Sequence, residues 1–198
     1  MAQEAREAPE VAARLIADNA ALCADLAHRL RAAPPPFVIT CARGSSDNAA
    51  TYLKYLVETR LGLVTASVGP SISSIYAGRL KARGALFVAV SQSGRSPDLL
   101  QLAQSARGEG ALTVALVNDA ASPLAAICES ALLLRAGAER SVAATKSFIA
   151  ALAAELQLCA HWTGDAGMLA ALESLPGVLS AALREDWSAA TPVLAKAR

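Results

Sequence analysis

The chain has 198 residues, with 18 basic and 17 acidic side chains and a formal net charge of +1. This length suits one domain, or one domain with a helical extension, and it is enough to bury a substantial core. Because the charge is nearly balanced and no run of Lys or Arg occurs, we expect no nucleic acid as the main partner. No apolar stretch approaches the roughly 18 residues of a membrane span, so we expect no membrane partner.

The cysteine content argues against a disulfide framework and against a metal site. The four cysteines are widely spaced in apolar contexts, without a C-x-x-C pair: Cys23, Cys41, Cys128 and Cys159. We interpret them as reduced core residues. With only two histidines and no ligand spacing, we expect no metal, and residues 1–30 do not resemble a secretory signal. We therefore expect a cytoplasmic protein.

Helical and apolar strand patterns alternate along most of the chain. A helix is predicted over residues 9–31, and the Pro-rich residues 34–36 end it. Five strands are predicted, over residues 37–41, 63–68, 85–90, 112–117 and 131–135, with helices near 45–61, 70–78, 96–107 and 122–128. Because several strands are apolar throughout, we expect an α/β fold in which helices cover both faces of a parallel sheet.

The last third of the chain is predicted to be helical. A long helix over residues 145–162 should end at a break around Gly164, and residues 166–184 predict another helix, bent or interrupted at Pro176. A further helical piece is expected to begin near Trp187. The expected organisation is an N-terminal helix (1–33), an α/β domain (34–163) and a helical extension or linker (164–198).

Two strand–loop–helix junctions carry loops that are rich in hydroxyl groups. The second junction has the sequence SQSGRSPD over residues 91–98. There, Ser96 is a suitable N-cap, Pro97 is a suitable first helical residue, and Asp98 interacts favourably with the helix dipole. The first junction has the sequence ARGSSD over residues 42–47. Either loop alone could be an ordinary turn, because Ser and Gly are common turn residues. The pair, however, favours two sides of one phosphate site at the carboxyl ends of parallel strands.

A third segment, residues 136–148, also follows a predicted strand and could close the same pocket. Glu139 is its candidate acid–base residue, although a role in bonding the loop is favoured. Lys146 could contact phosphate, pair with Glu139 or lie along the helix. Arg43 and Arg95 could contact phosphate or remain solvated. A nicotinamide-binding unit is disfavoured, since neither Ser loop contains G-x-G-x-x-G.

Residues 42–46 (ARGSS), 91–96 (SQSGRS) and 137–148 (GAERSVAATKSF) resemble the SIS (sugar isomerase) domain family, closest to the first SIS domain of glucosamine-6-phosphate synthase and related deaminases. The resemblance implies a flavodoxin-like three-layer αβα sandwich with a five-stranded parallel sheet, and no cofactor. It also implies a sugar-phosphate site. The residues implied in it are Gly44, Ser45, Ser46, Ser91, Gln92, Ser93 and Ser96 around the phosphate, with Val142, Ala144 and Lys146 in the third segment.

Three positions depart from the synthases: Ala144 stands where they usually have Ser, Arg43 where they often have Cys, and Arg95 where they have Glu. These departures suit a deaminase-like or other sugar-isomerase relative. Members of this branch usually carry two SIS domains, with catalytic groups largely in the second, so the resemblance implies that this chain is the phosphate-binding half of an enzyme.

Two alternatives remain open: a free-standing single-domain isomerase, and a non-catalytic sugar-phosphate sensor, although residues 1–35 do not look like a helix-turn-helix. We expect a homodimer, with residues 145–162 and 166–184 as its interface.

Overall fold

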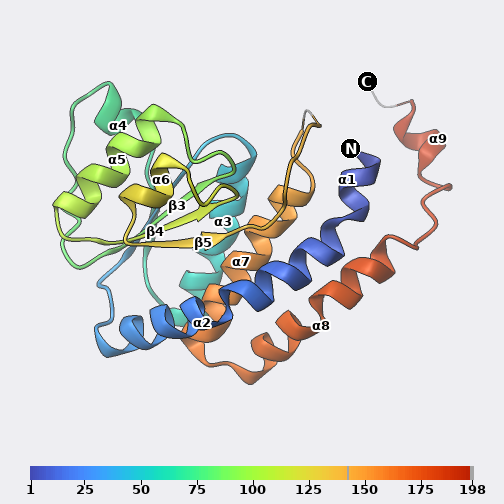
Figure 1. Cartoon of the computed structure of the whole chain (residues 1–198), viewed down its shortest axis with the longest axis horizontal. Helices are drawn as coiled ribbons and strands as arrows, with labels where there is room; N and C mark the ends of the chain where they lie inside the picture. The colour runs from blue at the N-terminus through green and yellow to red at the C-terminus, as the bar shows by residue number, and fades with distance from the viewer. Residues whose placement is uncertain (142, 197–198) are drawn as a thin grey trace.

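The computed structural model describes residues 1–141 and 143–196, and a parallel sheet lies between two layers of helices (Figure 1). The sheet order is β2-β1-β3-β4-β5, and every neighbouring pair is parallel. Its strands are β1 (Val38–Ala42), β2 (Thr65–Ser67), β3 (Leu86–Ser91), β4 (Leu112–Val117) and β5 (Ser130–Leu133). The predicted α/β class with a five-stranded parallel sheet is confirmed.

Helices cover both faces of this sheet, as the near-continuous apolar strands require. One face is packed by α2 (Ala8–Ala32), α3 (Ser45–Leu61) and α7 (Lys146–Thr163), and the other by α5 (Pro97–Gly108) and α6 (Pro123–Ile127). Side chains alternate between the two cores along each strand. In β3, Val88 and Val90 enter the first core while Phe87 enters the second, and all three are buried.

Helix α7 is the centre of the first face. It packs against α2, α3 and α8 (Ala166–Ala182), and most of its residues are buried. Small side chains such as Ala150, Ala153 and Ala154 allow neighbouring helices to approach closely. Because α7 is covered within its own chain, only α8 of the two helices predicted as an interface has an open face, where Val178 is 59% exposed. The homodimer itself stays a prediction.

Some helices differ from the sequence prediction. The helix expected over residues 70–78 is reduced to α4 (Ser71–Ser74), because Ile75 and Tyr76 are exposed and leave no buried face to stabilise a longer helix. Helix α8 continues through Pro176 without interruption. The last helical piece is only α9 (Thr191–Leu194), and a short helix α1 (Ala2–Arg6) precedes α2. None of the described helices combines the length and apolar character needed to cross a membrane.

Candidate functional site

The candidate site lies where the order of strands along the sheet reverses. Chain order runs outward in both directions from β1 and β3, so the crevice beyond their carboxyl ends is the expected ligand position in an open α/β sheet. Ala42 at the end of β1 pairs with Val90 near the end of β3. The two Ser-rich loops therefore leave the sheet side by side.

The first loop is a sharp turn between β1 and α3. Gly44 has φ +60° and ψ −134°, a conformation that side-chain-bearing residues rarely adopt. The turn lets α3 begin at once, so that Ser45 and Ser46 form its first two positions. Ser45 is exposed and Ser46 half-buried. The start of a long helix offers unpaired N–H groups and a positive dipole end beside these hydroxyls.

The second loop, between β3 and α5, is held from behind by its neighbours. The Ser91 hydroxyl accepts a hydrogen bond from Gly94 N at 3.1 Å, and Leu124 N donates to Gly94 O at 3.1 Å. Gly94 has φ +61°, and a Cβ placed there would lie 2.5 Å from the Ser122 hydroxyl oxygen. No larger residue fits this position without rearrangement. The loop is therefore fixed by its rear contacts.

The front of the second loop carries the predicted polar groups. Gln92 and Ser93 are exposed, and Ser96 is half-buried. Ser96 is the N-cap of α5, as predicted, yet its side chain makes no capping hydrogen bond within the described residues. Its hydroxyl is thus not committed to the helix start. Together these groups form a hydroxyl-rich rim around the N-terminus of α5.

The two loop arginines are paired with acids at the rim. Arg43 Nη1 lies 2.9 Å from Asp98 Oδ2, which links the first loop to the first turn of α5. Arg95 Nη2 lies 2.8 Å from Asp119 Oδ2. Both arginine side chains are more than half exposed. Each positive charge at this rim is therefore locally balanced by an acid.

A small pocket joins both loops to the third predicted segment. Ser45 and Ser46 contribute from the first loop, Gln92 from the second, and Ala144 from the segment before α7. Its remaining lining residues are Val90, Leu134, Ser147, Phe148 and Ala151. Residues that are far apart in the chain thus meet at one point beyond the carboxyl ends of β1 and β3.

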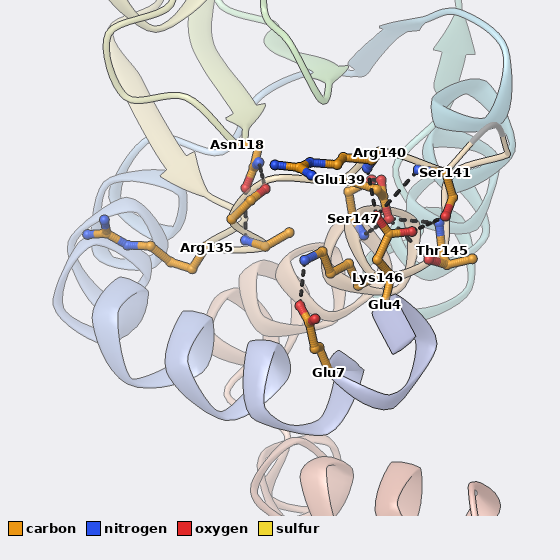
Figure 2. A network of polar contacts seen from close by, with 12 residues as sticks. Glu4, Glu7, Asn118, Arg135, Glu139, Arg140, Ser141, Thr145, Lys146 and Ser147 are labelled. Atoms are coloured by element: carbon orange, nitrogen blue, oxygen red, sulfur yellow. Dashed lines mark hydrogen bonds and ion pairs between the residues drawn. The ribbon is translucent and has the colours of Figure 1, made fainter. Parts of the chain in front are cut away.

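Glu139 is engaged by the start of helix α7 (Figure 2). Its Oε1 accepts from Thr145 N at 2.9 Å and from Ser147 N at 3.3 Å, and its Oε2 accepts from the Ser147 hydroxyl. Burial alone raises the pKa of this carboxyl, but these hydrogen bonds outweigh burial and lower the pKa overall. This is the geometry of a charged acid that satisfies the free N–H groups of a helix start.

Lys146 has a partner that the sequence did not reveal. Its side chain is 4% exposed, and Nζ lies 2.5 Å from Glu7 Oε2 at the junction of α1 and α2 (Figure 2). It lines a hollow beside α1, away from the pocket formed by the Ser loops. No local signal points to this pairing, because the partners are 139 positions apart in the chain.

The other candidate groups lie in less reactive positions. Val142 lies outside the described residues. His161 occupies the last turn of α7, whereas the pocket adjoins its first turns, and burial is the main cause that lowers the pKa of this histidine. Burial raises the pKa of the Cys41 thiol to about 12, which leaves it unreactive. Within residues 1–141 and 143–196, no cluster of His, Cys, Asp or Glu is arranged to hold a metal ion.

The fold and the pocket define a doubly wound α/β protein with a small pocket of mixed polar and apolar lining at the switch point of its sheet. The SIS domain model matches residues 36–160, so the chain belongs to the SIS domain family, and the resemblance found in the sequence is confirmed.

Two relatives link the chain to sugar-phosphate enzymes. A glutamine–fructose-6-phosphate aminotransferase of Halobacterium salinarum is 36% identical over 155 residues, which cover 74% of this chain and 25% of the relative. A protein of Silicibacter pomeroyi DSS-3, provisionally described as a phosphosugar isomerase, has a crystal structure 50% identical with a TM-score of 0.91. That match covers 94% of this chain and 57% of the other.

A more distant structure shares the fold alone. The C-terminal domain of glucosamine-fructose-6-phosphate aminotransferase from Francisella tularensis is 23% identical with a TM-score of 0.69, covering 89% of this chain and 52% of that one. The chain thus spans about a quarter of the length of the aminotransferase from Halobacterium salinarum, and roughly half of the length of the two structures.

Proposed function

We propose that this chain binds a sugar phosphate, with the phosphate at the N-termini of α3 and α5 and the sugar directed toward Ala144. The substrate class is a hexose 6-phosphate or an amino-sugar phosphate. Membership of the SIS family supports this proposal, as does the name of the Halobacterium relative, a fructose-6-phosphate aminotransferase. The wider proposal is the binding half of an isomerase, deaminase or aminotransferase.

The meeting of three separate segments carries the proposal, and the pocket enclosed between them has a volume of about 20 Å³ in this structure. Ser46 and Gln92 come from the two loops that start helices, and Ala144 comes from the segment before α7. An anion between the two helix starts would receive backbone N–H and hydroxyl donors from both loops. A sugar attached to it would then lie toward the third segment.

The local charges indicate how such a site would achieve affinity. Arg43 and Arg95 are each paired with an acid, so neither adds an unbalanced positive charge. Binding should therefore rest on directed hydrogen bonds to the charged phosphate, which are each worth about 1.5–3 kcal/mol. Affinity should accordingly depend only modestly on ionic strength.

Calorimetry with fructose 6-phosphate, glucosamine 6-phosphate and unphosphorylated fructose tests this proposal. The double variant Ser93→Ala/Ser96→Ala, at two hydroxyls on the front of the second loop, should weaken binding of the phosphorylated sugars by roughly 2–4 kcal/mol, since two donors to a charged group are lost. Ser174→Ala on the outer face of α8, exposed and bonded only to Ala171 O within the described residues, is the matched control. Equal affinity of the wild-type chain for fructose and fructose 6-phosphate would contradict the proposal.

We expect the chain alone to bind this substrate but to turn it over poorly. Aldose–ketose interconversion needs a base at C1 and C2 and an acid that opens the ring. Glu139 is held charged by hydrogen bonds that lower its pKa, so it is a weak base, and the Asp98 carboxylate is occupied by its ion pair with Arg43. The missing groups would come from a second SIS domain or its tail. Release of ammonia and fructose 6-phosphate from glucosamine 6-phosphate, abolished by Glu139→Gln, would instead support a free-standing enzyme.

A further inference from the structure

The N-terminal arm, residues 2–19, runs beside the β5–α7 connection that supplies the third side of the pocket (Figure 2). The arm consists of α1 and the first half of α2. It contacts residues 133–141 and Lys146 at several successive levels, mostly through polar side chains. No local sequence pattern links the two regions.

The contacts nearest to strand β5 fix the point at which the connection leaves the sheet. Asn19, which is 4% exposed, donates to Leu133 O at 2.9 Å and accepts from Leu133 N at 3.1 Å, so that it pairs with the edge strand β5. Arg14 donates to Arg135 O at 2.7 Å, and Asp18 pairs with the Arg135 side chain at 2.8 Å. Arg135 has φ +54°, an unfavourable conformation that these contacts hold in place.

The opposite side of the connection is fixed from within the sheet. Asn118, just after β4, accepts from Ala136 N at 2.8 Å and donates to Gly137 O at 2.7 Å. Asn118 N also donates to Gln92 O at 3.1 Å in the second Ser loop. One residue therefore ties the base of the connection to a loop of the proposed phosphate site.

The contacts nearer to helix α7 come from two acids of the arm, Glu4 and Glu7. Glu4 Oε1 accepts from Arg140 N at 2.6 Å and Ser141 N at 3.3 Å, and its Oε2 accepts from the Ser141 hydroxyl. Hydrogen bonds from Ser141 and from the Arg140 backbone lower the pKa of Glu4 to about 2. Glu7 forms the ion pair with buried Lys146 described above.

These polar contacts are not by-products of apolar packing. Helix α1 has no buried residue, so it adds nothing to the core. Between the arm and the connection lies a hollow of about 640 Å³, lined among others by Glu4, Glu7, Ser141 and Lys146. Because close packing is absent on this side, the position of residues 138–141 rests on hydrogen bonds and the ion pair.

We infer that Glu4 and Glu7 are positioning residues of the sugar side of the site. They hold the β5–α7 connection where Ala144 lines the pocket, while the two Ser loops keep their geometry without the arm. This inference rests on the proposed sugar-phosphate binding. The inference predicts different effects on the two parts of the ligand. Loss of the arm contacts should weaken recognition of the sugar and leave recognition of the phosphate intact.

Calorimetric titration of the full chain with fructose 6-phosphate and with inorganic phosphate tests the inference. Glu4→Ala should weaken fructose 6-phosphate binding about tenfold, which corresponds to about 1.4 kcal/mol, and change phosphate binding by less than about twofold. Glu4→Gln keeps an acceptor oxygen and should recover much of the loss. Glu10→Ala is the matched control, because Glu10 is an exposed acid of α2 without an ion pair among the described residues.

A loss that is equal for both ligands would show a general structural role, and unchanged affinity for both would remove any role of Glu4 at the site. Hydrogen exchange of the ligand-free chain supplies an independent readout. Glu4→Ala should accelerate exchange at the amides of Arg140, Ser141 and Thr145, and not at those of residues 92–96. Unchanged exchange there would overturn the inference. A wild-type chain that binds neither ligand, with accelerated exchange in the variant, would refute the proposed function alone.

Discussion

The Ser loops and the β5–α7 connection line one pocket but are held in place in different ways. In the first loop only Arg43 and Gly44 separate a strand from a helix, so the ends of β1 and α3 fix its position. The connection spans residues 134–145 and depends on side chains of the N-terminal arm and on Asn118. The two-residue first loop takes its geometry from the elements it joins, the second Ser loop is in addition held by Leu124 and packed against Ser122, and the longer connection needs partners from the other end of the chain.

The largest expected effect tests whether the second loop is as rigid as this comparison requires. Gly94→Ala should lower the free energy of unfolding by about 3 kcal/mol, because a Cβ at φ +61° meets the Ser122 hydroxyl at 2.5 Å. Gly62→Ala is the control: its φ is +68°, but nothing lies within 4 Å of the added Cβ, so about 1 kcal/mol is expected. Urea unfolding measures both, and equal losses would mean that the loop yields easily.

The next effect concerns helix α7, into which the connection runs. Glu155 is fully buried, and neither carboxyl oxygen has a hydrogen-bond partner among the described residues. Burial raises the pKa of this acid well above its ordinary value. Glu155→Leu should therefore raise the free energy of unfolding near neutral pH by about 2 kcal/mol, since an unpartnered polar group leaves the core.

The pH dependence of the Glu155→Leu effect follows from the direction of the pKa shift. The unfolded chain releases the Glu155 proton at lower pH than the folded chain, so this acid makes the protein less stable as pH rises above its ordinary pKa. The advantage of the variant should grow as pH rises above the ordinary pKa of a glutamic acid, by at most about 1.4 kcal/mol per pH unit. Glu173→Leu, at an exposed acid of α8, should show no such growth. A pH-independent advantage would contradict this account of Glu155.

Glu139 provides the opposite case within the connection. Glu139→Gln should cost about 1 kcal/mol of stability, because the charged acceptor for the start of α7 is lost. Since the folded pKa is lowered, the contribution of Glu139 is present above its ordinary pKa and disappears as pH falls through the lowered value. Unfolding measured near neutral and at acid pH checks both signs. A variant that is more destabilised in acid than at neutral pH would rule out the capping role.

The smallest expected effect lies at the rim of the Ser loops. Arg43→Ala removes an exposed ion pair with Asp98 and should change stability by less than about 0.5 kcal/mol. Because the charge of Arg43 is balanced in the pair, phosphate affinity should also change little. A loss of phosphate affinity greater than about tenfold, measured by calorimetry, would place Arg43 among the phosphate ligands instead.

Local chemistry explains which parts of the site could be predicted from sequence. Apolar strands, Ser-rich loops and a Pro after Ser96 are all local signals, and they correctly indicated the sheet, its two junctions and the family. The contacts of Glu4 and Glu7 could not be predicted, because each joins residues more than 130 positions apart that are neighbours only in the fold. The helix expected over residues 70–78 was wrong for a related reason: its apolar residues find no core to cover.

Amide chemical shifts, followed by nuclear magnetic resonance during titration of the full chain, test the central comparison most directly. Inorganic phosphate should shift the amides of Gly44, Ser45, Ser46 and residues 91–96 alone. Fructose 6-phosphate should shift the same amides and, in addition, those of Ala144, Thr145 and Ser147. Shifts that gather instead around Arg14 and Lys146, or phosphate responses that are absent from both Ser loops, would contradict the account.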